Sequence, residues 1–376
     1  MSLDWPFYEP RHRDLAARLS QWASANLAPR HGEDIDAECR KLVISLGAAG
    51  FLELCVGADA VPDVRSLAIA RATLAYYSGL ADFAFAMQGL GSGAISLAGS
   101  PEQKAEWLPK VASGGAIAAF AMTEPSTGSD AANIAMTALA DHGGYRLDGE
   151  KTYISNGGIA DFYTVLARTG EAEGARGLSM FIVRANEPGL SVAERIEVVA
   201  PHPLARLAFD GVRGEVIGTA GEGFGIAMRT LTLFRVTVAA AALGFARRAL
   251  DEAVAFASAR KLGKATLADN AVTQANLAEM ATAIDASALL VARAAWQQDT
   301  SPADNRRAAA MAKLHATESA QRVIDMAVQL HGGMGVTKGA MVESLYREIR
   351  ALRIYEGASE VQRQIIARDI IKQHRR

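Results

Sequence analysis

At residues 122–130 the sequence reads MTEPSTGSD, a loop-forming stretch that combines hydroxyl groups, two acids, a proline and a glycine. The chain changes character on either side of this stretch. From about residue 11 to residue 113, apolar residues recur every three to four positions, which lays one apolar stripe along a helix. From about residue 116 to residue 218 the pattern is typical of strands ended by turn formers. From about residue 223 onward the helical spacing returns in longer runs.

Individual runs predict the elements. Helices are predicted over residues 11–27, 37–49, 236–259, 277–298 and 308–330, and Ser100-Pro101 is typical of a helix start. Strands are predicted over residues 144–151, 162–167 and 178–183, with turn residues at Asp148-Gly149. The order of helices, sheet and helices predicts a mainly α protein with a central, mostly antiparallel β-domain or small barrel. We place the domains at residues 1–115, 116–221 and 222–376.

Composition narrows the function classes. The chain has 376 residues, half of them hydrophobic, and a net charge of −2 without long single-sign blocks, which argues against nucleic-acid and anionic-membrane partners. Cys39 and Cys55 form no CxxC pair, so neither a disulfide framework nor a metal site is expected. The N-terminus carries no apolar leader, and no stretch of about 18 uninterrupted apolar residues occurs. We therefore expect a cytoplasmic protein that does not bind a membrane.

Residues 89–94, GLGSGA, fit a loose glycine-rich motif for dinucleotide binding. The motif requires a preceding strand and a βαβ unit, whereas this stretch lies in a helical region. We interpret it as a close helix contact or a bend.

Two other segments carry stronger candidates for cofactor binding. In MTEPSTGSD, the hydroxyls of Thr123 and Ser129 and the amides beside Gly128 could bind a ring carbonyl or a phosphate, or the segment could be an ordinary turn. In GEKTYISNGG, residues 149–158, Tyr153 and Ser155 are two positions apart and therefore share a strand face. That face could stack on a planar cofactor, although a half-buried structural tyrosine gives the same pattern.

Residues 354–363, IYEGASEVQR, contain Glu356 between an aromatic residue and a glycine, just before a helical run. Apolar surroundings raise the proton affinity of a carboxylate, which suits a general base that removes a weakly acidic C–H proton. The alternative is a first-turn glutamate that complements the helix dipole. Upstream, we expect a solvated helix face on which arginines pair with glutamates: Arg347, Arg350 and Arg353 with Glu343 and Glu348.

Five segments, in this order, resemble the acyl-CoA dehydrogenase family over essentially the whole chain: MTEPSTGSD (122–130), GEKTYISNGG (149–158), GEGFGIAM (221–228), QLHGGMGV (329–336) and IYEGASEVQR (354–363). The resemblance implies an N-terminal helical domain, a central β-domain and a C-terminal four-helix bundle. It also implies non-covalent FAD, an acyl-CoA substrate, an electron-transfer flavoprotein as acceptor, and a homodimer or homotetramer. The acyl chain length and branching are left open.

The resemblance assigns roles to single residues. It implies that Glu356 removes the α-proton while a hydride leaves Cβ for flavin N5, which gives the 2-enoyl-CoA. Some family members keep their base at the position of Phe234, which cannot accept a proton, so Glu356 is the one candidate. Ser129, Arg235 and Gly357 match substrate contacts. FAD contacts match Phe120, Met122, Thr123, Ser129, Tyr153, Ser155, Arg260, Gln329, Gly333, Ser359 and Glu360.

One segment departs from the family pattern. The family usually carries R-x-x-F-G followed by a glutamine, which helps to hold FAD across a subunit interface. Here Arg260 is kept, but Gly263 and Ala271 stand at the aromatic and glutamine positions in an ungapped alignment; the alternative is a one-residue deletion. This predicts a weaker hold on FAD, or a hold through other residues. Two alternatives stay open: an acyl-CoA oxidase-type relative, and a catalytically degenerate member that acts as a partner subunit.

Overall fold

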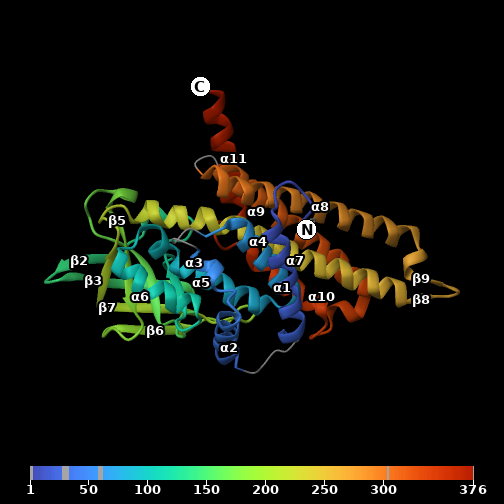
Figure 1. Ribbon diagram of the computed structural model, residues 1–376, viewed down its shortest axis with the longest axis horizontal. Coiled ribbons are helices and arrows are strands. Elements are labelled where there is room, and N and C mark those ends of the chain that lie inside the picture. The colour runs from blue at the N-terminus through green and yellow to red at the C-terminus, as the bar shows by residue number, and fades with distance from the viewer. Residues whose placement is uncertain (1–2, 28–33, 58–61, 303–304, 376) are drawn as a thin grey trace. The chain divides into compact units, whose positions relative to one another are not determined.

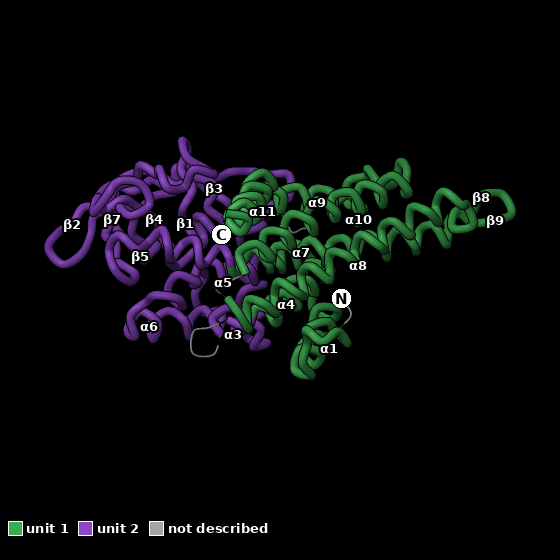
Figure 2. Tube along the Cα trace, turned by 90° about the horizontal axis from the view of Figure 1, so that it is seen from above, with its two compact units in different colours: residues 1–29, 64–82, 233–376 green, residues 30–63, 83–232 purple. Residues whose placement is uncertain are grey.

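The computed structural model describes residues 3–27, 34–57, 62–302 and 305–375. The chain divides into two compact units, which Figure 2 shows in different colours. We call residues 1–29, 64–82 and 233–376 the helical unit, and residues 30–63 and 83–232 the sheet unit. Two of the four divisions fall inside helices, α5 (Gly79–Ala98) and α7 (Gly223–Ala259).

The sheet unit contains a seven-stranded sheet among the described residues. Strand β4 pairs with β5, β5 with β7, β7 with β3 and β3 with β2, all antiparallel, and a single parallel pair between Thr137 and Arg168 joins β2 to β4. These pairings close a ring, which confirms the predicted mostly antiparallel, barrel-like domain. The strands are β1 (Ala118–Ala121), β2 (Thr137–Asp141), β3 (Gly144–Ser155), β4 (Phe162–Arg168), β5 (Leu178–Arg184), β6 (Leu190–Arg195) and β7 (Leu204–Ile217).

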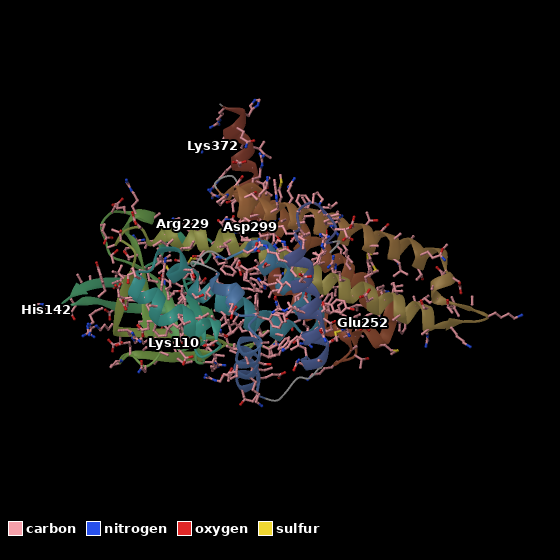
Figure 3. The ribbon with its side chains drawn as sticks, viewed as in Figure 1. Lys110, His142, Arg229, Glu252, Asp299 and Lys372 are labelled. Carbon is pink, nitrogen blue, oxygen red and sulfur yellow. The ribbon has the colours of Figure 1, made fainter. Side chains whose placement is uncertain are left out.

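The predicted turn at Asp148-Gly149 is wrong. Both residues lie inside β3, where Gly149 takes a φ of +141° at a shift in the register between β3 and β7. The partner strand β7 continues on both sides, so the chain forms a β-bulge and does not reverse. The reversal occurs at His142-Gly143, where Gly143 has a φ of +94°, and Figure 3 shows His142 at the tip of this hairpin.

Within the described residues, the α-helices of the sheet unit are α2 (Ile35–Ala48), α3 (Glu53–Val56), α5 from residue 83, α6 (Pro101–Ala112) and the start of α7 up to residue 232. A capping box at Ser100 and Gln103 starts α6, as the sequence predicts. The ring of Trp107 in α6 packs 4.3 Å from that of Phe162. A Cβ on Gly91 of α5 would lie 2.7 Å from atoms of Ala118 in β1. GLGSGA is thus a close helix–strand contact, since only glycine permits this approach.

The helical unit consists of long helices with a short two-stranded ribbon, which Figure 1 shows at the end of α7 and α8. Its elements are α1 (Pro10–Asn26), α4 (Val64–Tyr77), α7 from residue 233, β8 (Lys261–Leu262), β9 (Ala265–Thr266), α8 (Ala271–Thr300), α9 (Arg306–His331), α10 (Met341–Leu352) and α11 (Ser359–His374). Small residues let these helices approach closely. A Cβ on Gly244 of α7 would lie 2.3 Å from the carbonyl oxygen of Ala72 in α4.

A carboxylate on α8 fixes the start of α4. Asp299 accepts hydrogen bonds from the backbone N–H of Val64 at 2.8 Å and from the Arg65 side chain at 2.7 Å. Figure 3 labels Asp299 near the end of α8. Because an acid at a helix N-terminus satisfies free amides and favours the dipole, this contact holds α4 against α8.

Two described helices, α7 and α8, are long and apolar enough to cross a membrane on length and composition alone. The most apolar window of α7 is 83% buried, as in the core helix of a globular fold, whereas that of α8 is 33% buried. Two such helices are weak evidence for a membrane protein, and the cytoplasmic location stays a prediction.

Candidate active site

The loop between α10 and α11 carries Glu356 in an unusual backbone conformation. Glu356 has a φ of +53° and Gly357 a φ of +90°. Glycine adopts this left-handed region freely, but for a glutamate it costs roughly 1–3 kcal/mol. Such a conformation persists only where its surroundings enforce it.

Side chains from three helices enforce it by binding three consecutive carbonyl oxygens. Lys313 Nζ of α9 donates to Tyr355 O at 3.0 Å and to Gly357 O at 2.6 Å. Arg235 Nε of α7 donates to Glu356 O at 3.2 Å. Gln362 Nε2 of α11 donates to Gly357 O at 2.6 Å. We call Arg235, Lys313 and Gln362 the carbonyl clamp.

The Glu356 carboxylate is not held by hydrogen bonds to the described residues. Its Oε2 atom is buried and has no hydrogen-bond partner within the described part of the chain. Burial raises the pKa of Glu356 above its ordinary value, although Arg71, Lys313 and Arg235 lower it. The first-turn acid of α11 is Glu360. Glu356 therefore does not cap that helix and is suited to accept a proton.

A buried ion pair faces the same loop from α4 and α5. Arg71 Nε and one terminal nitrogen contact the two oxygens of Asp82 at 2.8 and 2.7 Å, with at most 4% of either side chain exposed. The other terminal nitrogen donates to Thr237 Oγ1 at 3.1 Å. The pair acts on Glu356 in opposite directions: Arg71 lowers its pKa and Asp82 raises it.

The predicted arginine–glutamate face on α10 is correct only in part. Arg347 pairs with Glu343 at 2.7 Å, but Arg353 pairs with Glu318 of α9 at 2.8 Å. Glu348 turns inward, and a Cβ on Gly79 would lie 2.4 Å from its carboxyl carbon. Burial raises the pKa of Glu348 to about 7. The spacing on the helix did not reveal that this position faces the corner between α4 and α5.

In the sheet unit, a buried ion pair orders the segment after β1. Lys151 Nζ donates to Met122 O at 3.0 Å and to Glu124 Oε1 at 2.9 Å. Glu124 Oε2 accepts from the Ala135 amide, and Glu124 Oε1 also accepts from the Met136 amide. Thr123 O accepts from the Thr152 amide at 2.9 Å. Phe120, Met122 and Thr123, which are half-buried, are thereby fixed beside β3.

The same strand presents a large aromatic ring. A second register shift, between Lys151 and Ile154, sets Tyr153 at a φ of +54° with 64% of the residue exposed. The bulge separates Tyr153 from the fully buried Lys151, two positions earlier, so simple alternation fails here. Ser155 is half-buried, and Ser129 is exposed in the preceding turn. The exposed ring of Tyr153, on a backbone fixed by the bulge and with serine hydroxyls nearby in the sequence, fits a planar, hydrogen-bonding ligand such as a flavin.

The residues predicted to reach a neighbouring subunit's FAD lie near the far ends of two helices. Phe256 of α7 stacks on His331 of α9, with ring centroids 4.3 Å apart. This contact places the helix end that carries Arg260 beside the helix end that carries Gln329 and Gly333, and these three residues are exposed. Two further predicted FAD contacts, Ser359 and Glu360, follow Glu356 in the chain. Glu360 is exposed, whereas Ser359 is buried and its hydroxyl donates a hydrogen bond to Glu318.

Three models of the acyl-CoA dehydrogenase family match the chain: the N-terminal domain at residues 9–115, the middle domain at 119–212 and the C-terminal domain at 221–371. The chain belongs to the acyl-CoA dehydrogenase family. Its members are FAD-dependent oxidoreductases that act on CH–CH groups, and the three-domain architecture of the family is the one predicted. Our exact domain limits stay a prediction.

Several acyl-CoA dehydrogenase relatives are similar over most or all of the chain. A 3-(aryl)acrylate reductase of Clostridium sporogenes is 38% identical over 281 residues, which cover 73% of this chain and 74% of the relative. Butyryl-CoA dehydrogenase from Megasphaera elsdenii is 30% identical, covers 99% of this chain and 100% of its own, and superposes with a TM-score of 0.91. A chain solved in a study of the electron transferring flavoprotein of Acidaminococcus fermentans is 32% identical, with coverages of 98% and 99% and a TM-score of 0.91.

Sequence reasoning missed the residues that hold the site in place. Glu124 and Lys151 lie within the quoted motifs, but their pairing was not predicted. Lys313 lies on the same face of α9 as the buried Ala309 and Ala316. A lysine at a buried helical position indicates a structural or functional role, and the sequence alone could have shown this. Gln362 lies in the quoted motif at 354–363 and binds a carbonyl oxygen only five positions away, but its role was not predicted. Arg71 and Asp82, eleven positions apart in different helices, were not predicted either.

Proposed function

We propose that this acyl-CoA dehydrogenase oxidises an acyl-CoA thioester to the 2-enoyl-CoA, with Glu356 as the base that removes the α-proton. The buried Oε2 atom of Glu356, without a protein partner among the described residues, carries the proposal. Burial raises the pKa of this carboxyl, which brings its basicity closer to that needed for a weakly acidic C–H bond. FAD, when bound, would supply the acceptor for the hydride that leaves Cβ.

The other roles follow from the positions of the chain's residues. The backbone N–H of Glu356 polarises the thioester carbonyl, so that charge developing on this oxygen is stabilised where it forms. Arg235 and Gly357 lie at the same loop and approach the substrate. The residues proposed to contact FAD are Phe120, Met122, Thr123, Ser129, Tyr153, Ser155, Arg260, Gln329, Gly333, Ser359 and Glu360. Ser129 also approaches the substrate.

The proposal extends to partners. Electrons pass to an electron-transfer flavoprotein, which the similarity to the Acidaminococcus fermentans chain supports. The enzyme forms a homodimer or homotetramer in the cytoplasm, in which the exposed cluster of Arg260, Gln329 and Gly333 meets the FAD of a second copy.

Substitution of the base tests the proposal. Glu356→Gln keeps the size of the side chain and the yellow colour of bound FAD, and we expect substrate-driven flavin bleaching to fall by at least about 10²- to 10⁴-fold. A panel of acyl-CoA thioesters of different length and branching, measured by loss of flavin absorbance, identifies the substrate. Full-rate bleaching in the variant would eliminate Glu356 as the base.

The same measurements separate the alternatives. Rapid reaction of the reduced flavin with oxygen would favour an acyl-CoA oxidase-type enzyme over a dehydrogenase. A purified protein that stays colourless after addition of FAD would favour a degenerate partner subunit. The similarity to the 3-(aryl)acrylate reductase favours testing the reverse reaction as well, in which protonated Glu356 returns a proton to Cα. Photoreduced enzyme mixed with an enoyl thioester would then reoxidise.

A further inference from the structure

We propose that Lys313 is a positioning residue that holds Glu356 in its left-handed backbone conformation and supplies a positive charge beside its carboxylate. The inference rests on the proposed role of Glu356 as the base. Lys313 contacts neither substrate nor reacting atoms in this proposal and acts through the loop of residues 355–357.

The geometry singles out this lysine. Its Nζ bonds the carbonyl oxygens on both sides of Glu356, those of Tyr355 and Gly357, at 3.0 and 2.6 Å. A single amine thus fixes the peptide plane before Glu356 and the plane after Gly357, so it holds both ends of the two-residue stretch with positive φ. Arg235 and Gln362 each bind one carbonyl oxygen of the loop, so only Lys313 bridges the two sides.

Stability alone does not account for a lysine here. The side chain is fully buried, and within the described residues it makes no ion pair with a carboxylate. Burial lowers its pKa to about 8, although Glu356, Glu318 and Glu360 raise it. A buried charge that is solvated only by carbonyl oxygens is costly compared with an apolar side chain. Its benefit therefore lies in what it does to the loop.

The charges that face Glu356 come from four helices. Arg71 of α4, Lys313 of α9 and Arg235 of α7 lower its pKa, and Asp82 of α5 raises it. Arg71 is committed to Asp82 by two hydrogen bonds, so its effect is partly cancelled. Removal of Lys313 leaves this loop with less positive charge, and the pKa of Glu356 rises. Tyr355 O also loses its donor and Gly357 O keeps only the hydrogen bond from Gln362, so the loop relaxes and displaces the carboxylate.

Two variants with a surface control test the proposal. Lys313→Gln keeps an N–H donor without the charge, and Lys313→Met removes both. Lys372→Met, on the exposed end of α11 (Figure 3), is the control. In each FAD-loaded variant, two rates are measured against pH: flavin bleaching by substrate, and exchange of the α-proton for deuterium in an acyl-CoA analogue whose β-carbon is replaced by sulfur. The analogue cannot lose a hydride, so its exchange reports on the base alone.

We expect Lys313→Met to lower both rates by about 10²-fold, the loss typical of a catalytic group displaced by 1 Å. In both variants the acidic limb of the pH profile moves to higher pH. The shift is smaller in Lys313→Gln, where the amide donor holds the loop, than in Lys313→Met, where the loop relaxes. The control keeps wild-type rates and profile. Unchanged rates and an unchanged acidic limb in Lys313→Gln and Lys313→Met would overturn the proposal, as would failure of both variants to fold. If Glu356→Gln still bleaches at full rate, the proposed function itself fails, which separates the two ideas.

Discussion

Lys151 Nζ lies 2.9 Å from Glu124 Oε1, and both side chains are buried, with 0% and 5% exposed. This pair connects β3 to the segment after β1, because Lys151 also binds Met122 O and Glu124 also binds the amides of Ala135 and Met136. The residues proposed to line the flavin therefore depend on one ion pair in the interior of the sheet unit.

Loss of one partner of this pair should be costly. Lys151→Met leaves the Glu124 carboxylate buried without its cation, and breaking a buried pair in this way costs about 3–5 kcal/mol. We expect a lower urea midpoint and loss of bound FAD on gel filtration. The double variant Lys151→Met/Glu124→Gln removes the unpaired charge and should regain part of the stability. Lys41→Met, an exposed lysine of α2, should change stability by no more than about 0.5 kcal/mol.

Tyr153 is predicted to serve the cofactor and not the fold. Its ring is exposed, and its φ of +54° is unfavourable for tyrosine, whereas asparagine tolerates this region. We expect Tyr153→Asn to leave the apoprotein at least as stable as the wild type. Loss of a stacked ring, worth about 0.5–1.5 kcal/mol, should raise the Kd for FAD by roughly 2- to 10-fold. Fluorescence titration of apoprotein with FAD measures the Kd; a destabilised apoprotein with unchanged Kd would indicate a structural tyrosine.

The sequence predicted the elements well, because their periodicity is local. The predicted helix over residues 308–330 agrees with α9, Arg306–His331, and the predicted strand over 178–183 with β5, Leu178–Arg184. Two local signals misled: Asp148-Gly149 is a bulge and not a turn, and α7 begins at Gly223, well before residue 236. In both places the tertiary partner, a continuing strand or a packed helix, overrode the local preference.

The site was predicted to a lesser extent, for a physical reason. The Glu356 motif is contiguous, so its chemistry is visible in the sequence. Of the residues that hold the Glu356 loop in place, Arg235 lies 121 positions from the carbonyl oxygen that it binds, and Lys313 lies 42 and 44 positions from its two. Gln362, five positions from Gly357, is the local member of the clamp. Periodicity cannot pair residues over such separations. It also cannot show that Glu348, on a helix rich in surface charge, faces inward.

Glu348 offers a test of stability against pH. Its folded pKa of about 7 lies above the ordinary 4.5 because of burial. The folded state thus binds this proton more tightly, and the free energy of unfolding falls as pH rises from about 4.5 to 7. We expect Glu348→Gln, which stays neutral, to melt at a higher temperature than the wild type at pH 8, with the difference vanishing below pH 4.5. A difference in Tm that is independent of pH would mean that Glu348 is not a buried titrating group.

The pair of Arg71 and Asp82 allows the electrostatics of the base to be separated from the stability of the fold. Arg71→Met leaves Asp82 buried and unpaired, which should cost about 3–5 kcal/mol. Because Arg71 lowers the pKa of Glu356 and Asp82 raises it, the single variant should shift the acidic limb of flavin bleaching to higher pH. In Arg71→Met/Asp82→Leu both opposing charges are gone, so the limb should return toward its wild-type position and part of the stability should be regained.

Stability is measured by urea unfolding. The acidic limb is measured by stopped-flow absorbance between about pH 5 and 9, the range in which a carboxyl group with a raised pKa titrates. If the double variant regains stability while its limb stays at the position of the single variant, the shift arises from a displaced loop and not from the charge of Arg71.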